Sequence, residues 1–236
     1  MITAQEATEQ PKPEGSSLLS MLGRPDAAAA LPALRDHVEG YLAEDDVLLS
    51  ARESAARAGC VPVTAATGAA LRFLAVTIHA RAVVEVGTGT GVSGLWLLRG
   101  MVADGTLTSI DIDPEHQRTA RGTFTAAGYG PSRVRLINGM ALDVLPRLTD
   151  AGYDLVFVDA APADHPRYLD EAVRLLRPGG IVVFDDVLGA AAPEGGADDG
   201  RTPGTSEVER RVRDDDRLVP VLLPLGDGLL AAVKTV

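Results

Sequence analysis

The sequence predicts an α/β protein built on a mostly parallel sheet, and three observations support this prediction. Five short, mainly apolar runs alternate with helical stretches between residues 82 and 185, which is the pattern of a parallel sheet covered on both faces. A glycine-rich segment follows the first run. Two more apolar runs flank Gly226-Asp227-Gly228, a hairpin signal that predicts an antiparallel last strand. We therefore expect a Rossmann-like sheet of seven strands, mostly parallel with an antiparallel C-terminal hairpin strand.

An N-terminal helical extension is expected to precede this sheet. Residues 1–17 are polar and contain several Pro, Gly and Ser residues, which predicts a flexible tail. Residues 18–60 are expected to form a helical segment, with helices over 26–43 and 45–58. Asp45 or Asp46 is placed to cap the second helix, and Gly59 to end it. A third helix, over 65–80 and capped by Thr64, opens a domain of residues 61–236.

Within this domain the elements follow from short apolar runs and longer amphipathic stretches. Strands are predicted over 82–86, 107–111, 134–138, 153–159 and 179–185. Helices are predicted over 92–103, from residue 114, near 141–148, around 166–176 and near 205–216. A Gly- and Ala-rich loop is expected over 189–204, and the hairpin runs cover 218–225 and 228–234.

The composition narrows the possible partners and the location. Lys and Arg number 22 against 33 Asp and Glu, a net charge of −11, so the surface should repel nucleic acids. The single cysteine, Cys60, cannot form an internal disulfide. No apolar run reaches the roughly 18 residues that span a bilayer, and the N-terminus does not resemble a secretory signal. We expect a cytoplasmic protein with no nucleic-acid or membrane partner.

The glycine-rich segment carries the clearest chemical signal. It runs from Glu85 through Gly87, Gly89 and Gly91, where the first strand passes into a helix. Glycines allow a tight turn and a close approach of a ligand to the backbone, and the free N–H groups of a helix N-terminus suit an anionic group. Asp111 ends the next strand, 20 residues after Gly91, where a carboxylate can accept the hydroxyl groups of a ribose.

Two nucleotide cofactors suit this geometry. Residues 89–94 match G-x-G-x-x-G, so an NAD(P)-dependent oxidoreductase is one hypothesis. Glu85 argues against it, because an acid beside the turn would repel a pyrophosphate. S-adenosylmethionine instead brings an ammonium that Glu85 can serve, a carboxylate for Ser93 and the helix amides, and a ribose for Asp111.

Residues 60–236 resemble the cation-dependent class I O-methyltransferases, the group of the catechol and caffeoyl-CoA O-methyltransferases. The resemblance is carried by VVEVGTGTGVSGLWL, LTSIDIDPEH, NGMALDVLPRL, YDLVFVDA, YLDEAVRLLRPGGIVVFDDVL and LPLGDGLLAAVK, in this order. It implies that residues 61–236 form a methyltransferase domain. It implies S-adenosylmethionine as cofactor, a small hydroxylated acceptor of the aromatic or natural-product kind, and a homodimer. The implied cofactor-binding residues are Val63, Glu85, Gly87, Thr88, Ser93, Asp111, Ile112, Met140, Ala141 and Asp159.

Three carboxylates predict a divalent metal site. Asp159 ends the fourth strand, and Asp185 and Asp186 end the fifth, so they should meet at one edge of the sheet. Oxygen ligands suit Mg²⁺, Mn²⁺ or Ca²⁺, and the resembling family holds a divalent ion at this position. A metal-bound hydroxyl loses its proton more readily, which would prepare the acceptor for methylation.

The chain departs from the family at positions that bear on catalysis. Asp186 stands where the family has Asn, and Pro162 where it has the Lys credited with assisting deprotonation. His165 lies three residues further on and is a candidate base together with Asp159, since imidazole titrates near neutral pH; the alternative for His165 is a solvated loop residue. These departures leave open a catalytically impaired S-adenosylmethionine-binding protein.

Overall fold

The computed structural model describes residues 27–189 and 202–236 of the chain. The tail expected over 1–17 and most of the loop expected over 189–204 lie outside the described residues. The chain divides into two units, residues 1–41 and 42–236, whereas the sequence suggested a division between residues 60 and 61. The smaller unit contains helix α2 (Ala27–Glu39), which falls within the helix predicted over 26–43.

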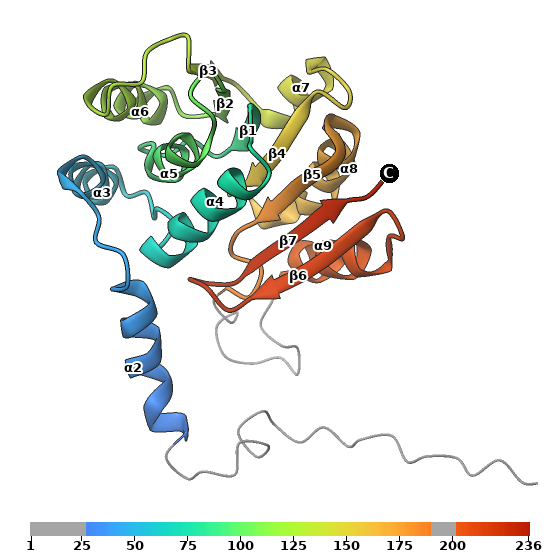
Figure 1. Cartoon of the computed structure of the whole chain (residues 1–236), viewed down its shortest axis with the longest axis horizontal. Helices are drawn as coiled ribbons and strands as arrows, with labels where there is room; N and C mark the ends of the chain where they lie inside the picture. Colours follow the sequence, from blue (N-terminus) through green and yellow to red (C-terminus); the bar gives the residue numbers. More distant parts are fainter. Residues whose placement is uncertain (1–26, 190–201) are drawn as a thin grey trace, which may run out of the picture. The chain divides into compact units, whose positions relative to one another are not determined.

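The larger unit is built on one seven-stranded sheet with the order β3-β2-β1-β4-β5-β7-β6 (Figure 1). Strands β1 to β5 are parallel to one another, and β7 lies between β5 and β6 and pairs antiparallel with both. The predicted antiparallel last strand is therefore confirmed. The strands are β1 (Ala82–Val86), β2 (Thr106–Asp111), β3 (Val134–Asn138), β4 (Tyr153–Val158), β5 (Leu176–Phe184), β6 (Leu218–Leu223) and β7 (Leu229–Lys234).

Helices cover both faces because successive strand residues point to opposite sides. On one side Val83 and its neighbours pack against residues of α3 (Asp46–Ala58), α4 (Ala65–Thr77), α5 (Val92–Gly100) and α6 (Pro114–Ala126). On the other side Val84 and its neighbours pack against α8 (His165–Leu175), α9 (Pro203–Asp214) and Leu145, which follows the short helix α7 (Ala141–Val144). These two layers of apolar contacts hold the strand ends that form the site.

The helix boundaries follow the predicted caps. The Asp45 side chain accepts a hydrogen bond from the Leu48 N–H at 3.1 Å at the start of α3, and Gly59 ends that helix with φ 67°. The Thr64 side chain accepts from the Thr67 N–H at 3.2 Å at the start of α4. No helix in the described part of the chain combines the length and the apolar character that a bilayer crossing needs.

Candidate functional site

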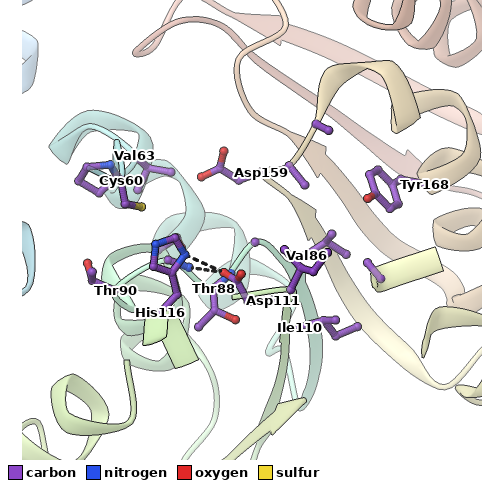
Figure 2. A pocket seen from close by; sticks show the side chains of 18 of the residues that line it. Cys60, Val63, Val86, Thr88, Thr90, Ile110, Asp111, His116, Asp159 and Tyr168 are labelled. Carbon is purple, nitrogen blue, oxygen red and sulfur yellow. Dashed lines mark hydrogen bonds and ion pairs between the residues drawn. The ribbon is translucent and has the colours of Figure 1, made fainter. Parts of the chain in front are cut away.

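A cavity of about 420 Å³ opens where β1, β2 and β4 end at the edge of the sheet (Figure 2). This is the edge at which parallel α/β sheets bind ligands. Of the ten residues predicted to bind the cofactor, nine line this cavity: Val63, Gly87, Thr88, Ser93, Asp111, Ile112, Met140, Ala141 and Asp159. Residues that were not predicted to bind the cofactor also line it, among them Cys60, His116 and Tyr168.

The glycine turn brings β1 and β4 together at the floor of the cavity. Gly87, Gly89 and Gly91 have φ values of 93°, 49° and 90°, a region that glycine adopts without the strain other residues incur. A Cβ atom on Gly87 would overlap the backbone carbonyl oxygen of Asp159. Gly87 therefore has to be a glycine for two reasons, the backbone conformation and the close approach of the neighbouring strand.

Asp111 is held by the backbone of this turn. Its Oδ2 atom accepts hydrogen bonds from the N–H groups of Thr88 at 3.0 Å and Gly89 at 2.9 Å. Its Oδ1 atom accepts from the Asp113 N–H at 2.8 Å. The Nδ1 atom of His116 lies 3.6 Å from Oδ2, a contact drawn in Figure 2. The carboxylate is thus fixed in one orientation at the cavity wall.

Glu85 lies beside the cavity and does not line it, unlike the other predicted cofactor-binding residues. Its side chain is fully buried and accepts hydrogen bonds from Ser93 Oγ at 2.6 Å and Ser109 Oγ at 2.5 Å. Burial raises the pKa of Glu85 to about 7, although the two serine hydroxyls act in the opposite direction. Any effect of Glu85 on a ligand therefore passes through its charge or through Ser93.

A buried polar chain that sequence reasoning missed continues from Glu85. Ser109 Oγ lies 2.6 Å from Thr88 Oγ1, which accepts a hydrogen bond from Gln117 Nε2 at 2.9 Å. The same nitrogen lies 3.3 Å from the carbonyl oxygens of Ser109 and Ile137. No local pattern in the sequence indicates this role, because the acceptors of Gln117 belong to three different segments. Gln117 therefore joins α6 to β2, β3 and the glycine turn.

Asp159 projects into the cavity from the end of β4 (Figure 2). Burial raises the pKa of its carboxyl to about 7, and the negative charges of Glu85, Asp186 and Asp111 act in the same direction. A carboxyl group that titrates near neutral pH is suited to accept a proton from a ligand.

The other two expected metal ligands, Asp185 and Asp186, do not line the cavity. Asp185 Oδ1 is buried without a hydrogen-bond partner, and burial together with the charge of Asp159 raises the Asp185 pKa to about 7. Asp186 has φ 55°, and its carboxylate occupies the space that a Cβ on Gly189 would fill. Across residues 27–189 and 202–236, no group of three or more His, Cys, Asp or Glu side chains is arranged to hold a metal ion.

His165 is likewise not brought to the cavity. Its ring is fully buried, with a centroid 5.3 Å from that of Phe184 and Nε2 3.2 Å from the carbonyl oxygen of Ala160. Burial lowers its pKa. The alternative of a solvated loop residue does not agree with this burial, because the imidazole packs against Phe184 in the core.

Comparisons with known proteins agree on one family. A family model described as O-methyltransferase matches residues 42–235. A protein of Mycobacterium sp. strain KMS, named as a candidate O-methyltransferase, is 54% identical over 212 residues, which are 89% of this chain and 95% of that protein. A Mycobacterium tuberculosis protein with the same description is 54% identical over 215 residues, covering 91% and 96% of the two chains.

Solved structures give the same picture. A Corynebacterium glutamicum protein superposes with a TM-score of 0.79 at 34% identity, over 88% of this chain and 98% of that one. The O-methyltransferase TomG from Streptomyces achromogenes, solved with S-adenosylmethionine, gives 0.76 at 29% identity, over 86% and 96%. An O-methyltransferase from Bacillus cereus, solved with S-adenosylhomocysteine, gives 0.75 at 26% identity, over 86% and 97%.

Proposed function

This chain belongs to the O-methyltransferase family, whose members use S-adenosylmethionine, and on that premise we propose that it methylates a hydroxyl group of a small aromatic or natural-product-like acceptor. The observation that supports this proposal is the cavity at the ends of β1, β2 and β4, with Asp111 and Asp159 in its wall. We assign Asp111 to the ribose of the cofactor. We assign Ser93 and the N-terminus of α5 to its amino-acid end.

The cavity suits S-adenosylmethionine better than a pyridine dinucleotide. Asp111 and Asp159 line it, and the buried Glu85 lies beside it. A pyrophosphate would meet these negative charges, whereas a cofactor that carries a sulfonium and an ammonium is attracted by them. The reported O-methyltransferase relatives favour the same choice over an oxidoreductase.

Asp159 is the residue that we assign to proton transfer. When bound, S-adenosylmethionine supplies an activated methyl group on a positively charged sulfur. The carboxylate of Asp159 lies in the same cavity and has a pKa raised to about 7 by burial and neighbouring acids, close to the value that favours a general base at neutral pH. It would take the proton of the acceptor hydroxyl. Pro162, which stands where the resembling family has a lysine, has no titratable group for this role.

The proposed acceptor class rests on the cavity and on one solved relative. The wall near α8 offers the Ala160 and Ala161 side chains together with the Tyr168 ring, which are groups that suit a compact, partly apolar ligand. TomG is described as taking part in tomaymycin synthesis, and this similarity favours a natural-product-like hydroxyl compound.

The three expected metal ligands do not fit a metal centre. Asp186 turns away toward Gly189, and neither Asp185 nor Asp186 lines the cavity with Asp159. The three carboxylates therefore do not surround one position for Mg²⁺, and the proposed proton transfer involves no metal ion.

Turnover assays test this function directly. Purified protein is incubated with S-adenosylmethionine and a panel of catechols, hydroxycinnamoyl thioesters and flavonoids, with EDTA or with added Mg²⁺, and the O-methylated product is identified by mass spectrometry. We expect methylation of at least one phenol, at rates that EDTA changes by less than about twofold. Strict dependence on Mg²⁺ would overturn the conclusion that the three carboxylates do not form a metal centre. Cofactor binding without turnover on any acceptor would favour the catalytically impaired alternative.

A cytoplasmic location and a homodimer are predictions of the sequence analysis that we retain as part of this proposal. Light scattering after size exclusion tests the oligomer, since a dimer would have twice the mass of the chain.

A further inference from the structure

The charged side chains in the cavity wall are mostly acidic. Its wall contains Asp111, Asp159 and Asp164, and none of the described residues that line it is a lysine or an arginine. Asp164 is paired with Arg167, whose Nη1 atom lies 3.2 Å from Oδ1. Arg167 therefore largely balances the charge of Asp164. Asp111 has the imidazole of His116 beside it, whereas the charged groups that act on Asp159 are all acids.

Asp111 and Asp159 differ in how their charges are stabilised. Asp111 accepts three backbone hydrogen bonds, from Thr88, Gly89 and Asp113. Among the described residues, no backbone hydrogen bond of this kind stabilises the charge of Asp159. The charged groups that act on it are the acids Glu85, Asp111 and Asp186. Within the described part of the chain, Asp159 is thus a half-buried carboxylate in an acidic surrounding.

A cationic ligand is the group that such a carboxylate lacks. The methyl donor and its product share one skeleton and differ at a single atom, because the donor has a positive sulfonium and the product a neutral thioether. Hydrogen bonds to the ribose, the adenine and the amino-acid end are common to both. A negative charge in a partly buried wall attracts the donor and gives the product nothing comparable.

We propose, on the basis of the proposed function, that Asp159 makes the cavity select the methyl donor, which carries a positive sulfonium, over the product, whose thioether sulfur carries no charge. The selection follows from the position of the carboxylate in the wall and from the absence of a lysine or arginine among the described lining residues. The consequence is a difference in affinity, since the acidic wall adds an attraction to the sulfonium that the thioether of S-adenosylhomocysteine does not receive.

Binding measurements with two stable ligands test the proposal without turnover. The ligands are S-adenosylhomocysteine and sinefungin, in which the sulfur is replaced by a carbon carrying an amine. At about pH 8 that amine is protonated, and the pH is above the pKa of about 7 of the Asp159 carboxyl, which is then mostly ionised. We expect calorimetry to show sinefungin binding at least about tenfold more tightly than S-adenosylhomocysteine to the wild-type protein, which corresponds to about 1.4 kcal/mol.

Two variants of matched chemistry locate the effect. Asp159→Asn is expected to reduce the ratio of the two affinities to less than about threefold, mainly by weakening sinefungin. Asp164→Asn changes an acid of the same wall that Arg167 already balances, and its ratio should stay within about twofold of the wild-type value. If Asp159→Asn fails to fold, wild-type protein suffices, because added salt should weaken sinefungin more than the neutral ligand.

The outcomes separate this inference from the proposed function. Equal affinity for both ligands in the wild-type protein, or an unchanged ratio in Asp159→Asn, would overturn the charge selection while leaving the cofactor site intact. Absence of binding by either ligand would overturn the proposed cofactor, and the inference with it.

Discussion

The carboxylate of Asp111 accepts a hydrogen bond from the backbone N–H of Gly89 at 2.9 Å, so that the end of β2 holds the turn that follows β1. The same oxygen also accepts from the Thr88 N–H. A residue that the sequence assigned only to ribose binding therefore also shapes the glycine turn. Variants of Asp111 should report on both roles.

We predict that Asp111→Ala weakens S-adenosylhomocysteine binding by about 1–3 kcal/mol, because hydrogen bonds to a charged group are lost. Asp111→Asn keeps one oxygen that can accept from the turn, so its loss should be smaller. Calorimetry on both variants measures the two effects. Unchanged affinity in Asp111→Ala would remove Asp111 from the cofactor site.

Gly87 offers a test of how closely β1 and β4 approach at the floor of the cavity. Gly87→Ala would place a methyl group against the carbonyl of Asp159 and strain a backbone at φ 93°. Gly128→Ala adds the same methyl group at φ 84°, with no atom within 4 Å. We expect about 1–2 kcal/mol of destabilisation for Gly128→Ala and more than about 3 kcal/mol for Gly87→Ala, measured by urea unfolding. Equal losses would mean that the contact with Asp159 contributes nothing.

Elements were predictable where local patterns decide them. The bounds of β1 and β3 match the predicted runs over 82–86 and 134–138, because short apolar runs bounded by turns are unambiguous within an alternating α/β chain. Strand β5 begins at Leu176, three residues before the predicted start. Leu176 pairs with Tyr153 of β4, and the register between β4 and β5 shifts between Tyr153 and Leu155. This extension of β5 depends on the neighbouring strand and not on a local pattern.

The site was predictable as an edge of the sheet, but the direction of single side chains was not. Asp111 and Asp159 follow from the rule that parallel strands end at one edge. Asp186 follows the same rule by position, yet its left-handed backbone turns the carboxylate toward Gly189. Gln117 was missed because its three acceptors belong to different segments, which only the folded sheet brings together.

The buried carboxyl of Asp185 predicts a pH-dependent stability. Its pKa rises from 3.8 to about 7 on folding, so the folded state favours the protonated form. This contribution to stability is fully present below about pH 4 and is lost as the pH rises through about 7. We expect Asp185→Asn to raise the melting temperature at pH 8 by at least about 2–4 °C, the shift given by about 1 kcal/mol, and to have less effect at pH 5.

An exposed aspartate provides the control for this stability measurement. Asp216 follows α9 on the surface, and Asp216→Asn should change the melting temperature by less than about 1 °C at both pH values, since surface substitutions have small effects. A gain for Asp185→Asn that is equal at pH 5 and pH 8 would show that the carboxyl is not titrating as described.

Variants of His165 and Asp159 distinguish the two side chains that the sequence analysis named as candidate bases. His165 is fully buried against Phe184 and does not line the cavity, whereas Asp159 does. His165→Gln retains an amide that can donate to the Ala160 carbonyl, so we expect kcat and KM within about threefold of the wild-type values and a pH–rate profile of the same shape. Asp159→Asn should lower kcat by about 100-fold or more, the usual effect of losing a general base. Steady-state kinetics across pH, with melting temperatures measured in parallel, distinguish the two. If His165→Gln lost activity as Asp159→Asn does while keeping its melting temperature, the imidazole would have to reach the reacting hydroxyl through a rearrangement of the turn at Pro162–Asp164.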